Sequence, residues 1–217
     1  ATGSSATALR HGSQDAGLGR WREMTLFPWF FREHVRFKNF KEWSFEFHDR
    51  FGNEESMKSL GAPPPDETDR LDKALCDYFL TGGFPEVAKT TDLAEARRRL
   101  RQDILDRSLG RDIIDIVPVD PVMLERLFLR VCQHPGGLWN ETAVAQELGI
   151  ARPTVAKYTH LLEEAFLIFR LPNLASPIKG LHKMYLVAPS LRAAMLTLDE
   201  KDLSDPNEWG PLTENTI

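Results

Sequence analysis

The sequence predicts a mainly α-helical protein of the α+β class, in which a bent helical region is followed by a winged helix-turn-helix. Apolar residues recur at spacings of three and four on both sides of a Gly-Gly-Phe-Pro corner at residues 82–85. Three amphipathic segments with glycine-containing turns follow between residues 121 and 164, and two short apolar runs come after them. With 42% hydrophobic residues in 217, the chain has enough apolar material for well-packed cores.

The amino-acid composition limits the functions that this protein can have. The net charge of −5 excludes a chain that is basic throughout, so nucleic acid would have to be bound by a local patch. No apolar run of the length that spans a bilayer and no signal-peptide layout is present, so we expect no membrane partner. Cys76 and Cys132 each fall in a predicted helix, which favours reduced thiols and a cytoplasmic location.

The first 66 residues are the least regular part of the chain. Within residues 1–36, alternation over residues 21–28 predicts a strand, and Trp29–Val35 is typical of the start of a helix. Residues 37–66 end in Pro63-Pro64-Pro65, a linker signal. Neither end of the chain resembles a finished element, so we expect it to be part of a longer protein.

The corner joins two predicted helices. Tyr78 and Phe79 belong to the apolar face of the first helix, and Gly82 and Gly83 suit the left-handed geometry that ends one. Pro85 has its φ preset for the first turn of the next helix. We therefore expect a rigid corner.

A further helix is predicted over Leu93–Ser108, with Asp92 and Glu95 as a capping box. It carries a basic run, Arg97-Arg98-Arg99 with Arg101. Nucleic-acid binding is one interpretation of this run, and a solvated face with intrahelical ion pairs is the one that we favour, because acidic residues follow on the same helix.

Residues 121–190 carry the clearest supersecondary pattern. Pro121–Cys132 is amphipathic, Asn140 can cap a second helix that Gly149 ends, and a third helix begins near Pro153. Strands are predicted at Phe166–Leu171 and Met184–Val187, joined by a loop that contains proline and lysine. Together these elements predict a winged helix.

The third helix would present a candidate DNA-binding face. Between Ala151 and Lys183 there are five Lys/Arg and two acidic residues, a local excess that permits DNA contact without requiring it. Winged helices also serve as protein-contact modules, and that alternative stays open. The candidate DNA-binding residues are Arg152, Thr154, Lys157 and His160.

Searches for catalytic and metal motifs find little. Cys132-x-His134 has no further cysteines at zinc-finger spacing, so we expect no metal site. The chain contains neither a Gly-x-Ser-x-Gly elbow nor a Gly-x-x-x-x-Gly-Lys-Ser/Thr phosphate loop. By itself it is not recognisable as a complete enzyme, so its enzyme status stays uncertain.

The order of several motifs, taken together, carries a family resemblance. They are Thr-Gly-Ser-Ser-Ala, Gly-Arg before a strand, Pro-x-x-Phe-Arg-Glu, Tyr-Phe-Leu-Thr-Gly-Gly-Phe-Pro-Glu-Val and Gly-Ile-Ala-Arg-Pro-Thr-Val-x-Lys-Tyr. From Thr2 to about Asn215 the chain resembles the bacterial and archaeal AAA-type P-loop ATPases related to STAND and Orc-like ATPases, which carry a C-terminal domain of unknown function. The resemblance implies ATP and Mg²⁺ as cofactors of the intact protein, with the Walker A and B segments before Ala1.

The resemblance also implies a domain order. Residues 1–36 would be the distal edge of the α/β ATPase core, 37–66 an insertion or linker, and 67–112 a helical lid around the corner. Residues 113–187 would be the winged helix, and 188–217 the truncated start of a C-terminal domain. Self-association through the core, or a protein partner, would be possible in such a protein.

The site residues implied by the resemblance lie in the edge of the ATPase core and at the corner of the lid. Ser4 matches a hydroxyl that helps to orient the attacking water, with Thr2 and Ser5 beside it as cofactor contacts, and Arg20 matches an arginine finger. Gly83 and Pro85 match the lid motif that packs on adenine. From the residues alone, each retains a structural alternative: a loop or cap for the hydroxyls, a surface arginine, and a purely structural corner.

Two departures limit the resemblance. At Tyr185–Ser190 the acidic residue of the family's next domain is missing, so a carboxylate pair for metal-assisted cleavage cannot be assembled. Ala151 replaces the usual serine helix cap. We expect the C-terminal portion of an AAA-type ATPase, whose lid and winged helix couple ATP to DNA or protein. The alternative is a non-enzymatic winged-helix DNA-binding transcriptional regulator.

Overall fold

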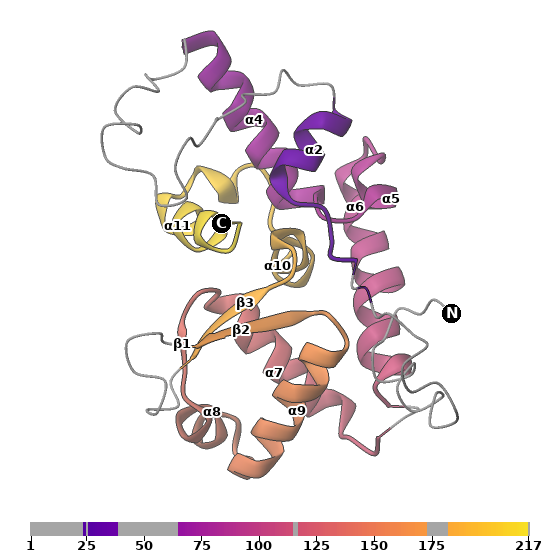
Figure 1. Cartoon of the computed structure of the whole chain (residues 1–217), viewed down its shortest axis with the longest axis vertical. Helices are drawn as coiled ribbons and strands as arrows, with labels where there is room; N and C mark the ends of the chain where they lie inside the picture. Colours follow the sequence, from indigo (N-terminus) through magenta and orange to yellow (C-terminus); the bar gives the residue numbers. More distant parts are fainter. Residues whose placement is uncertain (1–23, 25, 39–64, 115–116, 173–181, 217) are drawn as a thin grey trace.

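The computed structural model describes residues 24, 26–38, 65–114, 117–172 and 182–216. The described chain is mainly helical, with one small sheet, which confirms the predicted class at that level (Figure 1). The elements, in order, are α2 (Phe31–Phe37), α4 (Pro65–Thr81), α5 (Pro85–Ala88), α6 (Leu93–Arg99), η1 (Leu100–Leu105), η2 (Ser108–Asp112), α7 (Pro121–Gln133), β1 (Leu138–Trp139), α8 (Glu141–Leu148), α9 (Arg152–Glu164), β2 (Ile168–Pro172), β3 (His182–Leu186), α10 (Pro189–Leu196), η4 (Asp202–Ser204) and α11 (Pro206–Glu214).

The sheet has three antiparallel strands in the order β1–β3–β2. Phe169 lies opposite Tyr185 in the pairing of β2 with β3, and Trp139 lies opposite His182 in that of β1 with β3. The sequence predicted β2 and β3 to within two residues at each end, but it missed β1. A strand of only two residues leaves no alternation to detect.

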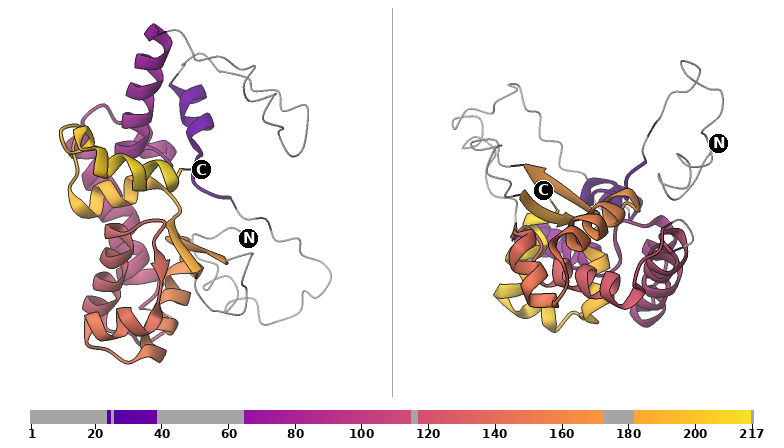
Figure 2. Two further views of the ribbon diagram at one scale, coloured as in Figure 1. Left: turned by 90° about the vertical axis from the view of Figure 1, so that its left-hand side faces the viewer. Right: turned by 90° about the horizontal axis from the view of Figure 1, so that it is seen from below.

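The molecule has a helical end and a sheet-bearing end (Figure 1). Helices α2 and α4 form the helical end, while α7, α8, α9 and the sheet form the other (Figures 1 and 2). Strand β3 leads directly into α10, which packs on both α4 and α7. The helix that begins with α6 continues through η1 beside α10 and reaches α7 through η2.

One hydrophobic core crosses the predicted boundary between residues 112 and 113. Leu100, Leu105 and Leu109 belong to the same buried cluster as Leu124 and Leu162 of the sheet-bearing end. A second cluster joins Tyr78 and Phe79 of α4 to Leu212 of α11. The segments predicted as lid, winged helix and C-terminal domain therefore share buried cores.

Side-chain caps explain where several helices begin. The carboxylate of Asp92 accepts from Ala94 N–H at 3.0 Å, and that of Asp120 caps α7 in the same way. Asn140 Oδ1 accepts from Thr142 N–H and so caps α8 as predicted, while Gly149 ends that helix with φ of +66°. Each such cap satisfies an amide that would otherwise lack a partner in the first turn.

The predicted helix Leu93–Ser108 extends further than expected and changes its winding. Both η1 and η2 are π-helical, and the N–H of Asp106 donates to the carbonyl of Arg101, five residues back. The buried apolar residues explain the wider turn, because Leu105 follows Leu100 by five positions. In an α-helix, residues five apart point about 140° from each other, so a π turn is needed to bury both.

The N-terminal predictions are only partly met. Helix α2 confirms the helix predicted from Trp29, although it begins two residues later. Met24 and Leu26–Pro28 belong to no strand, so the predicted strand over residues 21–28 is wrong where the structure describes it. Exposed apolar side chains, such as Leu26 at 98%, do not show the half-buried alternation that a strand needs.

The C-terminal helix α11 is fastened to the sheet. Buried Asn215, just after it, accepts from Leu186 N–H at 2.7 Å and donates to Leu186 C=O at 3.0 Å. Glu214 pairs with Lys183 and accepts from Tyr185 Oη. The amide of Asn215 thus completes the hydrogen bonding of β3 beyond the end of β1.

Candidate functional site

The corner between α4 and α5 is built around two glycines. Gly82 N–H donates to Tyr78 C=O at 2.8 Å, and a Cβ on Gly82 would overlap the Tyr78 ring. Gly83 has a φ of +90°, a conformation that L side chains rarely adopt. Pro85 then opens α5, as predicted. The sequence therefore identified the corner, the positive φ of Gly83 and the start at Pro85, but Gly82 does not have the left-handed geometry that was also expected of it.

Gly83 also permits a close approach between the corner and α10. A Cβ on Gly83 would lie 2.6 Å from Ala188 Cβ, which is closer than such atoms come. Ser190 is fully buried in the first turn of α10, and its hydroxyl donates to Gly82 C=O at 2.6 Å. Because Gly83 has no side chain, the corner and α10 can pack closely against each other.

A third segment completes this contact. Trp29 N–H donates to Gly83 C=O at 2.7 Å, and Tyr78 Oη donates to Trp29 C=O at 2.9 Å. Burial raises the pKa of Tyr78, with a smaller contribution from the charge of Glu33, so its hydroxyl stays protonated. We refer to these contacts among Trp29, Tyr78, Gly82-Gly83, Ala188 and Ser190 as the corner interlock.

The predicted cofactor contacts at the corner differ in access. Gly83 is buried, whereas Pro85 is exposed. Thr2, Ser4, Ser5 and Arg20 lie outside the described residues. The family resemblance implies six residues for a nucleotide site. Of the two that the structure describes, Pro85 is the exposed one.

A half-buried polar cluster lies beside the interlock. His34 is fully buried on α2, and its Nε2 lies 2.9 Å from Asp77 Oδ2 on α4. Lys38 Nζ is 3.1 Å from the same oxygen. Burial raises the pKa of Asp77, but the hydrogen bonds from His34 and Lys38 outweigh burial and leave it below its usual value. This cluster fastens α2 to α4.

The four candidate DNA-binding residues lie on α9, and three of them contact the protein itself. Arg152 Nε lies 3.2 Å from Glu141 Oε2, and Lys157 Nζ donates to Pro118 C=O at 3.0 Å. His160 Nε2 lies 3.6 Å from Glu164 Oε1, while Thr154 is half-buried. Arg152, Lys157 and His160 remain exposed, so they share an accessible face, but one with acidic neighbours.

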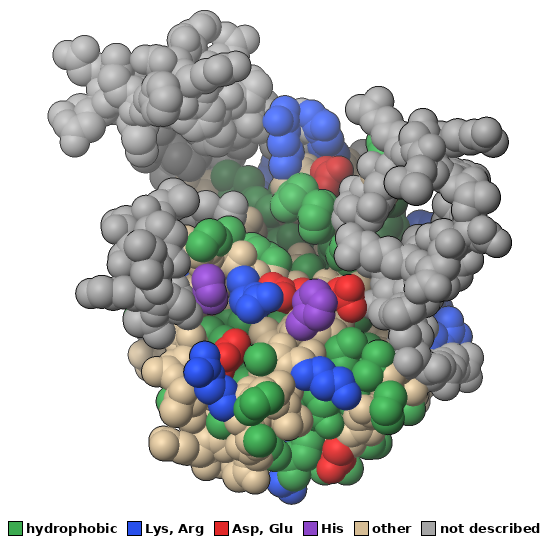
Figure 3. All heavy atoms as spheres, turned by 60° about the horizontal axis from the view of Figure 1, so that its bottom comes forward, with side chains coloured by type: hydrophobic (Ala, Val, Ile, Leu, Met, Phe, Trp, Pro, Cys, Tyr) green, Lys and Arg blue, Asp and Glu red, His purple; other side chains and the backbone are tan. Residues whose placement is uncertain are grey.

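The local positive charge that the sequence suggested nearly disappears once the neighbouring helices are included. Residues 117–186 contain seven Lys/Arg and six Asp/Glu, because residues 117–150 add four acids and only two bases to the segment from Ala151 to Lys183. Figure 3, which brings the sheet-bearing end forward, shows basic, acidic and histidine side chains interspersed with apolar ones. Phosphate binding by this face would rest on few unneutralised charges.

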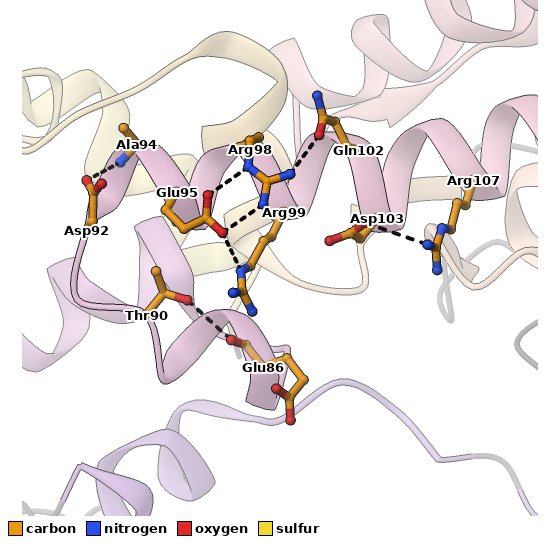
Figure 4. A network of polar contacts seen from close by, with 10 residues as sticks. All are labelled: Glu86, Thr90, Asp92, Ala94, Glu95, Arg98, Arg99, Gln102, Asp103 and Arg107. Atoms are coloured by element: carbon orange, nitrogen blue, oxygen red, sulfur yellow. Dashed lines mark hydrogen bonds and ion pairs between the residues drawn. The ribbon is translucent and has the colours of Figure 1, made fainter.

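Part of the basic run forms intrahelical ion pairs, as predicted (Figure 4), whereas Arg97 donates to Leu198 C=O instead. Glu95 accepts from both Arg98 and Arg99, and Arg107 lies 3.8 Å from Asp103. These arginines lower the pKa of Glu95 to about 2 through the hydrogen bonds that they donate. Glu95 therefore pairs with these arginines and does not form the predicted capping box with Asp92.

Other site chemistry is not found in the described residues. No group of three or more His, Cys, Asp or Glu in them is arranged to hold a metal ion. Both cysteines are free thiols, and burial raises the pKa of Cys132, which makes it unreactive. Among the described helices, none combines the length and apolarity needed to cross a membrane.

The fold thus defines a mainly helical class of protein, in which a glycine–proline corner packs on α10, the helix that follows the sheet. The chain belongs to the family described as "Domain of unknown function (DUF8612)", whose match covers residues 72–202. The matched region runs from α4 to η4 and contains the corner, η1 and η2, the sheet and α10.

One curated relative comes from Haemophilus influenzae and carries the name "Uncharacterized protein". It is 26% identical over 175 residues, which cover 78% of this chain and 37% of the relative. The chain therefore spans well under half the length of this relative. No solved structure matches the chain significantly.

Sequence reasoning missed most partners of the corner. Tyr78 could have been placed against Gly82, because residues four apart share one face of a helix. Ala188 and Ser190 follow the corner by more than a hundred residues, and no local pattern connects them to it. The pairing of His34 with Asp77 is equally invisible in the sequence.

Proposed function

We propose that this chain is the lid and winged-helix region of an AAA-type P-loop ATPase. In this proposal the Gly82–Pro85 corner passes the nucleotide state of the intact protein to the sheet-bearing end. That end then acts on an output partner, either DNA or another protein.

The corner interlock is the observation that carries the proposal. It joins the corner to the first turn of α10, and α10 follows β3 after two residues. Because no flexible loop intervenes, a change in the angle of the corner would move β3, the central strand of the sheet. The element order from α7 through β3 supports assigning this end as a winged helix.

The corner suits an adenine contact at one residue. The exposed ring of Pro85 offers an apolar edge to a flat base, whereas the Cα of Gly83 is covered by Ala188. We therefore assign the contact to Pro85 and the structural role to Gly83. Bound ATP and Mg²⁺ would supply the phosphate chemistry through residues before Ala1.

The first test reads the gene upstream of Ala1 for Gly-x-x-x-x-Gly-Lys-Ser/Thr and an apolar strand that ends in Asp. The second titrates the intact protein with a fluorescent ATP analogue in the presence of Mg²⁺. Pro85→Asp suits the helix N-terminus but places a negative charge near the nucleotide, so we expect roughly tenfold weaker binding. Exposed Glu86→Gln is the matched control and should not weaken it. A missing phosphate loop, or equal affinity of wild type and Pro85→Asp, would overturn the proposal.

A DNA-binding regulator without ATPase activity is the second candidate, favoured by the exposed Arg152 and Lys157 on α9. Duplex DNA titrated at two salt concentrations should bind the Arg152→Ala/Lys157→Ala variant more weakly and with a shallower salt slope than wild type. Identical curves would indicate that this face contacts protein or only packs.

A further inference from the structure

The π segment η1 contains one residue more than the packing of its helix requires. Buried Ala96 and Leu100 are four apart, and so are buried Leu105 and Leu109, whereas Leu100 and Leu105 are five apart. The spacing of four is the α-helical one, and the spacing of five marks a one-residue insertion. Exposed Gln102 and Asp103 lie inside the inserted turn.

The sequence at this turn fits a second register. Half-buried Ile104 precedes Leu105 and already packs against the same core. It lies four residues after Leu100, where an α-helix would place the next inward residue. Both registers therefore bury one large aliphatic side chain.

Ion pairs hold the observed register. Arg101 Nε lies 3.1 Å from Asp106 Oδ1, a pairing five residues apart that a π turn permits and an α turn separates. Arg101 also pairs with Glu125 on α7 and lies 2.8 Å from Met195 Sδ on α10. Arg101 thus links the register of its own helix to both α7 and α10.

We propose that η1 is a register switch, in which Ile104 replaces Leu105 in the core and Asp106 turns away from Arg101. The N–H of Asp106 then bonds to the carbonyl of Gln102 in place of Arg101, and η2 absorbs the displaced residue. The shift turns the affected residues by about 100° and loosens the attachment of Arg101 to α7. Its use as a relay from the corner rests on the proposed function, but the shift itself needs no nucleotide.

Deletions test whether η1 holds an extra residue. Removing exposed Gln102 should give a folded protein with an unchanged or higher Tm, because the remaining residues fit an α-helix. Removing exposed Arg126 from regular α7 is the matched control, and it should lower the Tm severely by misplacing Leu127 and Phe128. Equal damage from both deletions would overturn the proposal.

NMR relaxation dispersion of the 217-residue chain tests the switching. Wild type should show microsecond-to-millisecond exchange at amides 100–112, because a minor state of about 1% or more is detectable in this way. Asp106→Asn should increase this exchange, and Ile104→Ser should abolish it by removing the replacement side chain. Flat wild-type profiles, or exchange unaffected by Ile104→Ser, would contradict the switch. Since no ATP is added, such a failure would leave the ATPase test untouched.

Discussion

Among single residues, the corner depends most on its two glycines, because they have no side chains. Gly82 makes room for the Tyr78 ring within its own helix, and Gly83 makes room for Ala188 across the molecule. The sequence predicted the need for positive φ, because a glycine pair ends a helical pattern there. It could not predict the close approach of Ala188, which depends on how α10 packs.

Gly83→Ala should destabilise the fold by about 2–3 kcal/mol, because the new methyl group meets Ala188 and the backbone has φ of +90°. Adding Ala188→Gly removes the nearest atom, so the double variant should recover part of the loss. Urea unfolding measures both. If the two substitutions lower the free energy of unfolding additively, so that the double variant recovers nothing, Gly83 does not pack on Ala188 as described.

The cluster of His34, Lys38 and Asp77 gives the attachment of α2 a pH dependence. Asp77 has a lowered pKa in the folded protein, so it stabilises the fold above its unfolded pKa of about 3.9. This contribution is lost as pH falls through the lower folded pKa. We expect the Tm difference between wild type and Asp77→Asn to be full at pH 7 and to shrink below about pH 4. A difference that persists unchanged at pH 2 would exclude this role of the carboxylate.

At the scale of elements, predictability followed the local pattern. The helix capped by Asn140 was found because both the cap and the apolar period lie within a few residues, and α7 was found from its apolar period although its cap, Asp120, was not predicted. The π segments were missed although the spacing from Leu100 to Leu105 was visible. A search for spacings of three and four does not register an isolated five.

Helix α11 depends on Asn215 for its attachment to the sheet. Asn215→Ala would leave the N–H and C=O of Leu186 without partners, so we expect a loss of about 1–3 kcal/mol in the free energy of unfolding. Exposed Thr213→Ala is the matched control and should change it little. Equal effects of the two substitutions in urea titrations would argue against this attachment.

At the scale of the whole molecule, the predicted domain boundaries do not separate the cores. The cluster that begins at Val87 continues to Ala194, across the boundary between residues 112 and 113. Sequence patterns locate elements but say little about which elements share a core, because that depends on contacts between distant segments. The same reason explains why the corner was predicted and its interlock was not.

We propose that the corner and α10 respond together to nucleotide. Hydrogen–deuterium exchange of the intact protein, with and without ATP and Mg²⁺, measures this response. We predict that peptides covering residues 78–88 and 186–196 change their exchange together on nucleotide binding. We also predict that Gly83→Ala, where it still binds nucleotide, separates the two responses. Nucleotide binding that changes neither peptide, or only one of them in the wild-type protein, would show that the corner and α10 are not coupled.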